Sequence, residues 1–252
     1  MLELKNIRKT YPGVVALDGI SVSFKQGEVH AVMGENGAGN STLIKIISGA
    51  INPDPGAEII FDGKSYPQMT PALSAENGVA VIYQDINLVT PMTVAENMFM
   101  GRKMGKIYSK RHLNKLAQEI FDEYGFQLDP AMRVERLSPA NQQMVEIARA
   151  ISNNAEIMIM DEPTAPLAAA EVDLLFSVIA KLKAKGVTVI YISHRMEEIF
   201  EICDSVSVFR NGTYVNTRSL DGVTRDELIS MMVGRDVKSV FPKVDCKIGD
   251  VV

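Results

Sequence analysis

The sequence predicts an α/β fold: a mainly parallel β-sheet with a smaller antiparallel β region and a helical region beside it. Three observations support this. A short apolar run at 29–33 leads into a glycine-rich loop and then a helix. The apolar runs at 157–160 and 187–192 are typical of parallel strands that are buried on both faces. Between these two halves, residues 92–153 carry helical patterns and no strand pattern.

The first third of the chain supplies most of the expected strands. Residues 2–7 and 20–24 alternate apolar and polar side chains, as half-buried strands do. The helix after the glycine loop is expected at 41–48. A strand at 58–61 is followed by Asp62-Gly63, a dipeptide that favours a tight hairpin turn. The strand at 79–83 places Gln84 at its end.

The rest of the chain alternates helices and strands. Further helices are expected at 93–100, 110–124, 138–152 and about 172–182, and a hairpin at 206–215 around Asn211-Gly212. We therefore assign 1–30 and 56–66 to the antiparallel region, 92–153 to a helical insertion, and the remainder up to 240 to the core of one domain. Residues 241–252 are expected to be a loosely ordered linker.

Composition limits the classes of function. The 252 residues have a formal net charge of −5 and a pI near 5.3, which argues against a protein that mainly covers nucleic-acid phosphates. Two cysteines suit a reducing compartment. No apolar run approaches the roughly 18 residues that span a bilayer, so any role at a membrane would be peripheral and through a partner.

The stretch Gly34-Glu35-Asn36-Gly37-Ala38-Gly39-Asn40-Ser41-Thr42 matches a phosphate-binding loop, G-x-x-x-x-G-K-[ST], except that Asn40 stands at the lysine position. Glycines let backbone N–H groups converge on phosphate oxygens, and the following helix adds the positive end of its dipole. Ser41 is placed to bind Mg²⁺ and Thr42 to bond a phosphate. The alternative is a glycine-rich turn that binds nothing.

A second chemical signal lies at 157–163, where a buried apolar strand ends in two adjacent carboxylates. Asp161 suits Mg²⁺ binding, and Glu162 suits the positioning of an attacking water. The alternative is that these are solvent-exposed acids at a strand end with no role in binding or catalysis. The glycine loop in the same chain makes the functional interpretation the better one.

The order of these motifs resembles that of the ATP-binding cassette (ABC) ATPases, and the resemblance covers nearly the whole chain. It implies a RecA-like core, a bound ATP with Mg²⁺, and the following roles. Tyr11 stacks on adenine, and Gln84 bridges Mg²⁺ and the transport partner. Ser138 belongs to the signature at 137–142, and residues 165–168 form the D-loop. Asp161 binds Mg²⁺, Glu162 is the catalytic carboxylate, and His194 contacts the γ-phosphate.

Narrower phrases at 11–18, 142–148 and 190–199 are similar to the monosaccharide importers of this family, of the ribose, galactose or xylose type. Their ATPases usually fuse two cassettes in one chain. The resemblance therefore implies a second cassette, membrane-embedded permease subunits, a periplasmic or extracellular sugar-binding protein, and a place on the cytoplasmic face of the inner or plasma membrane. Residues 241–252 would lead toward the second cassette.

Asn40 is the serious departure from the family pattern. Lysine offers a mobile positive charge to the β- and γ-phosphates, whereas asparagine offers a short neutral amide. A charge-assisted hydrogen bond is worth about 1.5–3 kcal/mol, so we expect weaker nucleotide binding and impaired hydrolysis. An inactivated variant, a decayed paralogue and a regulatory half-site all remain open. Pro139 and Pro166 also depart from the pattern, but Pro139 is tolerated in a first helical turn.

Two other surfaces have alternative interpretations. The basic residues between 102 and 115 suit either a nucleic-acid or lipid surface or a solvated helix face, and we favour the solvated face. The apolar residues between 85 and 104 suit a permease-docking groove or simply seat the helical insertion. The competing functions are a non-transport ABC ATPase that acts on nucleic acid or the ribosome, and an ATP-binding regulatory module without hydrolysis.

Overall fold

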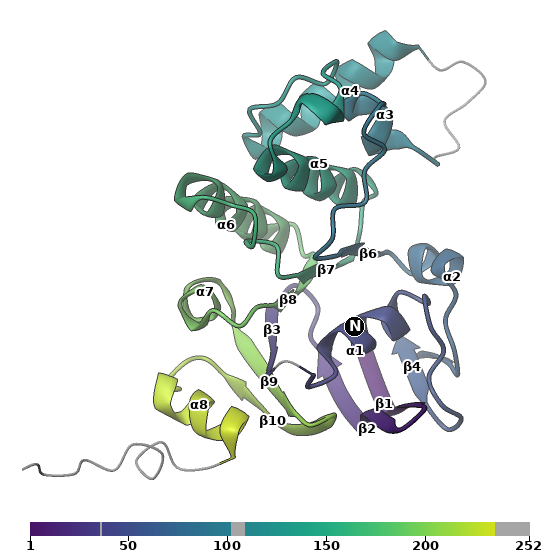
Figure 1. Ribbon diagram of the computed structural model, residues 1–252, viewed down its shortest axis with the longest axis vertical. Coiled ribbons are helices and arrows are strands. Elements are labelled where there is room, and N and C mark those ends of the chain that lie inside the picture. Colours follow the sequence, from purple (N-terminus) through teal and green to yellow (C-terminus); the bar gives the residue numbers. More distant parts are fainter. Residues whose placement is uncertain (36, 102–108, 235–252) are drawn as a thin grey trace, which may run out of the picture.

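The computed structural model describes residues 1–35, 37–101 and 109–234, and it confirms the α/β fold (Figure 1). A six-stranded sheet has the order β10-β9-β3-β8-β7-β6, and a four-stranded sheet has the order β2-β1-β4-β5. The strands are β1 (Leu2–Tyr11), β2 (Val14–Phe24), β3 (Val29–Gly34), β4 (Glu58–Phe61), β5 (Lys64–Tyr66), β6 (Val79–Ile82), β7 (Ile157–Asp161), β8 (Thr188–Ile192), β9 (Ser205–Arg210) and β10 (Thr213–Ser219).

The six-stranded sheet is mainly parallel, as expected. β9, β3, β8, β7 and β6 all run in the same direction, and only β10 pairs antiparallel, with β9. Every residue of β7 and β8 is buried, which explains why these strands read as continuous apolar runs. The parallel arrangement brings the carboxyl ends of β3, β7 and β8 to one edge of the sheet, where ligands bind in open α/β folds.

The four-stranded sheet is antiparallel throughout. Its tight turn at Asp62 and Gly63 has φ angles of 46° and 82°, as the dipeptide predicted. One boundary was wrong: residues 29 and 30, assigned to the antiparallel region, lie in β3 of the six-stranded sheet. Val29 begins an apolar run that is buried on both faces, so it belongs to the parallel sheet rather than to a half-buried one.

Two buried clusters hold the fold together, and β7 contributes to both. Its residues Met158 and Met160 pack into the cluster that includes the helical region, whereas Ile157 and Ile159 pack into the cluster between the sheets and α1. Successive side chains of a strand point to opposite faces, so one strand joins the two clusters. Burying apolar surface on both faces stabilises the sheet by roughly 25 cal/mol per Å² of apolar area.

The helices are α1 (Asn40–Ile47), α2 (Pro71–Glu76), α3 (Val94–Phe99), α4 (Lys110–Tyr124), α5 (Pro139–Ser152), α6 (Ala169–Ala184), α7 (Met196–Ile202) and α8 (Arg225–Val233). α3, α4 and α5 pack on one another and form the upper part of Figure 1, beyond α6. The described part of 92–153 contains no strand, only an isolated bridge between Thr93 and Arg133. Among the described residues, no helix is both long and apolar enough to cross a membrane. Residues 235–252, which include the expected linker, lie outside the described part of the chain.

Candidate nucleotide-binding site

The glycine loop joins β3 to α1, and two of its glycines are required by close approach. A Cβ atom at Gly34 would lie 2.5 Å from the Cβ atom of Ala38 and 2.8 Å from the carbonyl oxygen of Phe209. At Gly39, where φ is 103°, a Cβ atom would lie 2.4 Å from a methyl group of Leu17. Both contacts are shorter than van der Waals distance, so side chains at these positions would force the loop apart.

The N-terminus of α1 faces this loop without a side-chain cap. Gly39 is the N-cap residue, and no side chain accepts a hydrogen bond from the first turn. The Leu43 N–H donates to the carbonyl oxygen of Gly39 at 2.9 Å, which leaves the N–H groups of 40–42 without carbonyl partners inside the helix. Such a helix end favours an anion, because its N–H groups and its dipole act together.

A cavity of about 360 Å³ opens at the glycine loop and collects most of the predicted site residues. It is lined by Val14, Ala16, Gly34, Glu35, Gly37, Ala38, Gly39, Asn40, Ser41, Thr42, Gln84, Asp161, Glu162, Ile192, Ser193 and His194. The tight loop, the two carboxylates, the glutamine and the histidine come from four separate stretches of the sequence. The parallel sheet brings them together at one edge, which is the arrangement that the motifs predicted.

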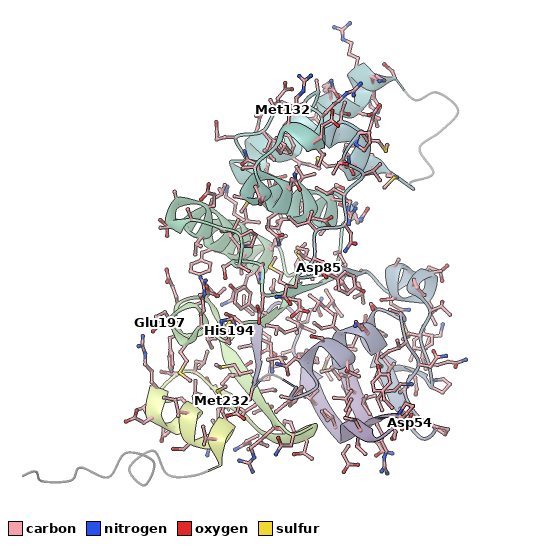
Figure 2. The ribbon with its side chains drawn as sticks, in the orientation of Figure 1. Asp54, Asp85, Met132, His194, Glu197 and Met232 are labelled. Atoms are coloured by element: carbon pink, nitrogen blue, oxygen red, sulfur yellow. The ribbon has the colours of Figure 1, made fainter. Side chains whose placement is uncertain are left out.

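Glu162 is contacted on both carboxylate oxygens. The Nδ1 atom of His194 lies 3.0 Å from Oε1 of Glu162, and the Nε2 atom of Gln84 donates to Oε2 at 3.5 Å. The Glu162 side chain is 27% exposed and that of His194 is 64% exposed. The carboxylate is therefore oriented from two sides while a path to solvent stays open, as the positioning of a water molecule requires. Figure 2 shows His194 in the middle of the molecule, close to the strand ends.

The backbone of Glu162 is strained. Its φ angle is 46°, in the left-handed region that non-glycine residues adopt at a cost of order 1–3 kcal/mol. Its N–H donates to the carbonyl oxygen of Ile192 at 2.9 Å, and its own carbonyl oxygen accepts from Ala165 at 3.2 Å. These bonds hold the chain in a sharp bend directly after β7, which turns the Glu162 side chain toward His194.

Asp161 precedes Glu162 and is only 8% exposed. Burial and the neighbouring charge of Glu162 raise the pKa of Asp161 to about 6, although the charge of Lys45 acts in the opposite direction. A divalent cation here would favour the ionised form, and the oxygen donors of Ser41 and Gln84 that share the cavity suit Mg²⁺.

Asn40 is the first residue of α1, and its amide has an unusual environment. The Oδ1 atom is buried, and within the described residues it has no hydrogen-bond partner. It lies near Gly34, where an added Cβ atom would be 3.5 Å away. A buried acceptor without a partner costs about 1–3 kcal/mol. The asparagine therefore folds back into the loop and places no positive charge in the cavity.

Comparison with known proteins decides the family. The sequence profile of the family described as "ABC transporter" matches residues 17–165. The chain belongs to the ABC transporter family. The glycine loop, Gln84, Ser138 and Asp161 all lie inside the matched range.

Individual relatives agree with this family. The chain is 47% identical over 255 residues to a Hahella chejuensis protein named as a ribose/galactose/methyl galactoside import ATP-binding protein, with 100% of the chain and 49% of the relative covered. It is 44% identical over 254 residues to the galactose/methyl galactoside import ATP-binding protein MglA of Yersinia pestis bv. Antiqua, with 100% and 50% covered. The chain thus spans about half the length of the curated relatives that it matches.

Solved structures of ABC cassettes share the fold. The ADP conformation of an ATP-binding cassette of an ABC transporter superposes with a TM-score of 0.80 at 27% identity, with 93% of this chain and 99% of that chain covered. A cassette described as a dimeric, post-hydrolysis state with bound ADP and Pi superposes with a TM-score of 0.79 at 26% identity, with 88% and 100% covered.

Two predicted site residues of the ABC cassette lie outside the cavity. Tyr11 is 39% exposed at the end of β1 and pairs with Val14, which does line the cavity. Ser138 caps α5, where its hydroxyl accepts from the N–H of Asn141 at 3.2 Å, and Pro139 occupies the first helical turn as predicted. Asn36, also assigned to the site, lies outside the described residues.

Sequence reasoning missed several residues of the cassette that line the cavity. Val14, Ala16 and Ser193 are among them. Val14 and Ala16 fall in the stretch 11–18, which we interpreted only as a marker of the sugar-importer branch. Their proximity to the glycine loop follows from the packing of Leu17 against Gly39, a long-range contact with no periodic signal in the sequence.

One polar network has the connectivity of a catalytic triad but cannot reach a substrate. The Nδ1 atom of His30 lies 2.9 Å from Oε1 of Glu28, and its Nε2 atom lies 2.7 Å from the hydroxyl of Ser207. His30 is 1% exposed and Ser207 is 0% exposed. The network links β3 to β9 inside the sheet, so its role is to satisfy buried polar groups.

Proposed function

We propose that this chain is the ATP-binding subunit of an ABC-type sugar importer, which couples ATP binding and hydrolysis to transport, and that Asn40 impairs its hydrolysis. The observation that carries the proposal is the single cavity shared by the uncapped start of α1, Ser41, Asp161 and Glu162. The sugar specificity rests on the 44–47% identity to sugar import ATP-binding proteins over the whole chain.

The residues of the cavity divide into binding and catalytic roles under this proposal. Backbone N–H groups of 37–42 hold the phosphates of ATP, and Tyr11 lies beside the cavity where the adenine ring would stack. Ser41, Gln84 and Asp161 supply oxygen ligands for Mg²⁺, which when bound neutralises charge on the phosphates. Glu162 orients the attacking water, and His194 contacts the γ-phosphate.

Ser138 acts at a distance in this proposal. It starts α5 in the helical region and is directed to an ATP held by the opposite cassette when two cassettes close head to tail. The similarity to a cassette described as dimeric supports a second cassette as partner. The remaining partners are membrane-embedded permease subunits and a sugar-binding protein outside the membrane, and no nucleic acid is involved. The cassette then works on the cytoplasmic face of the inner or plasma membrane.

Binding of nucleotide is tested by calorimetry with Mg-ATP, comparing the chain with Ser41→Ala and with Ser65→Ala as the matched control. Ser65 is exposed on β5, an edge strand of the four-stranded sheet, and does not line the cavity. Loss of the hydroxyl ligand should weaken the binding of Mg-ATP to Ser41→Ala by roughly tenfold to a hundredfold, on the scale of about 1.5–3 kcal/mol for a hydrogen bond to a charged group. The difference should shrink in EDTA, because the serine acts through Mg²⁺. If the parent chain shows no saturable binding of ATP, the proposed function is wrong.

Transport is tested in the cell that makes the chain. In a strain whose gene is disrupted, a copy that carries Asn40→Lys should raise the uptake of labelled ribose, galactose or xylose above the level given by the unaltered copy. If the uptake of all three sugars is unchanged, the importer assignment is wrong.

One competing function has support from a specific observation. A regulatory module that binds ATP without hydrolysing it would need no cation at position 40, and the buried, neutral amide of Asn40 fits that requirement. Hydrolysis after Asn40→Lys separates the two. A regulatory module stays inactive, whereas an impaired ATPase regains turnover.

A further inference from the structure

A buried glutamate that no sequence motif singled out stands between the two loops of the catalytic residues. Glu198 lies on α7 and is 5% exposed. Its Oε1 atom accepts from the hydroxyl of Thr164 at 2.8 Å. Its Oε2 atom accepts from the hydroxyls of Tyr191 and Ser193, both at 2.8 Å. One carboxylate therefore accepts from three hydroxyl groups, which lie in the loop after β7, in β8 and in the loop after β8.

Two of these donors are close in the sequence to Glu162 and His194. Thr164 is two residues after Glu162, and Ser193 is the residue before His194. The Ser193 hydroxyl also accepts from the N–H of Arg195 at 3.0 Å, on the other side of the histidine. Glu198 thus ties the loop after β7 to the loop after β8, and these are the loops that place Glu162 and His194 within 3.0 Å of each other.

Both catalytic residues need this support. Glu162 has a φ angle of 46°, and such a backbone persists only where its surroundings determine it from several sides. His194 is 64% exposed at its side chain, so packing contributes little to its orientation and the position of its backbone decides where the ring lies.

The carboxylate is itself well compensated in its buried place. The guanidinium of Arg195 donates to Oε1 at 3.3 Å and supplies positive charge. Burial and the charge of Glu198 raise the pKa of Tyr191, so the phenol stays protonated and donates. A buried carboxylate with all its hydrogen bonds formed is held rigidly. Truncation of its side chain leaves several donors without partners.

We propose that Glu198 is a positioning residue that holds Glu162 and His194 in register for the attack of water on the γ-phosphate. The inference rests on the proposed ATPase function. Glu198 does not line the cavity that contains the glycine loop. Its removal should therefore act on the chemical step and spare the binding of ATP.

The kinetic test uses the Asn40→Lys chain as the parent, so that turnover is measurable. Glu198→Ala should lower kcat by about tenfold to a hundredfold, the scale expected when a reacting group is misplaced by about 1 Å. KM for ATP should stay within about twofold. Glu198→Gln, which keeps the shape and one acceptor oxygen, should retain more of kcat than Glu198→Ala. All rates are normalised to the folded fraction measured by thermal unfolding.

Two matched controls separate positioning from general stability. Thr164→Val removes one hydroxyl from Glu198 without a change in volume, so it tests the inference even if Glu198→Ala fails to fold. Thr188→Val makes the same change at an equally buried threonine at the opposite end of β8 (3% exposed, against 2% for Thr164). Thr164→Val should lower kcat, and Thr188→Val should leave it unchanged. Equal effects in both would contradict the inference.

A second readout uses the unaltered chain and needs no turnover. The imidazole NMR signals of His194 report its hydrogen bond to Glu162. In Glu198→Ala and in Thr164→Val these signals should move toward their positions in Glu162→Ala, whereas Thr188→Val should leave them in place. Unmoved His194 signals in both variants would overturn the inference while the proposed function stands. A parent that binds ATP but shows no turnover after Asn40→Lys would overturn the proposed ATPase activity and the inference with it.

Discussion

The Nδ1 atom of His194 and the Oε1 atom of Glu162 lie 3.0 Å apart, although the two residues lie in the loops that follow different strands, β8 and β7. Gln84 contacts the other oxygen of the same carboxylate at 3.5 Å. This arrangement orients a carboxylate whose side chain is still 27% exposed. These three residues form the part of the cavity that bears most directly on hydrolysis, whereas the glycine loop bears on phosphate binding.

Glu162→Gln, made in the Asn40→Lys chain, should abolish turnover and keep the binding of Mg-ATP. The amide has nearly the same shape but cannot orient and activate the water as a carboxylate does, and loss of a single preorganised group costs on the order of 10²–10³ in rate. Phosphate release and calorimetry measure the two quantities. Glu197→Gln is the control, since its side chain is 71% exposed and pairs with Arg225. Turnover that survives Glu162→Gln would show that the assignment of this residue is wrong.

The structure changes which residues can form the predicted permease-docking groove. Of the apolar side chains after Gln84, Met98 and Phe99 are core residues with 1% and 4% exposure, so they seat the helical region. Leu88 is partly buried against the same cluster. Val89 and Met100 remain available, with 39% and 47% exposure. Figure 2 places Asp85, which begins this segment, where the helical region meets the rest of the molecule.

Val89→Asp and Met100→Asp should therefore uncouple ATPase activity from sugar uptake in an intact transporter with a working ATP site. ATP binding and the folded state should be unaffected, because both side chains are exposed. Met132→Asp is the matched control, since Met132 is 38% exposed at a different place in the helical region. If uptake and ATPase activity stay coupled in both groove variants, the docking proposal fails.

The segment after Gln84 is also hydrogen-bonded to α5. The N–H of Asn87 donates to Glu146 at 3.1 Å, and Arg149 donates to the carbonyl oxygen of Asn87 at 3.0 Å. Burial raises the pKa of Glu146, while the charge of Arg149 acts to lower it. Arg149→Ala leaves this 5%-exposed carboxylate without its cation.

Arg149→Ala should destabilise the chain by about 1–3 kcal/mol, the usual cost of a buried polar group that loses its partner. Denaturant unfolding measures the change. The double variant Arg149→Ala, Glu146→Gln should recover part of the loss, because the uncompensated charge is gone. Arg133→Ala is the control, since that arginine is 59% exposed and pairs with Glu135 at the surface. A double variant no more stable than Arg149→Ala would refute this explanation.

Much of the fold could be predicted because it follows from local patterns. α4 has the predicted bounds, Lys110–Tyr124, and the Asn211-Gly212 turn has the positive φ angles that its residues favour. α8 was missed because only Leu228 in it is buried, so it has no apolar periodicity. A readable signal was present all the same, in the capping box of Thr224 and Glu227.

The site shows the same division. Motif patterns identified Ser41, Asp161 and Glu162, and the family resemblance implied Gln84 and His194. The sheet brings all five to one cavity. Glu198 could not be found this way, because its importance lies in contacts with Thr164 and Ser193 that only the tertiary fold creates. The effect of Asn40 was predicted from its missing charge, but the burial of its Oδ1 atom was not predictable from the sequence.

The most direct test of the central claim is the ATP turnover of the unaltered chain against Asn40→Lys, measured side by side with the Kd for Mg-ATP. A lysine restores a charge-assisted contact to the phosphates and removes the buried amide oxygen that has no partner among the described residues. We expect binding to tighten roughly tenfold to a hundredfold and turnover to rise on the order of 10²–10³. Equal turnover in the two chains, whether high or absent, would contradict the account.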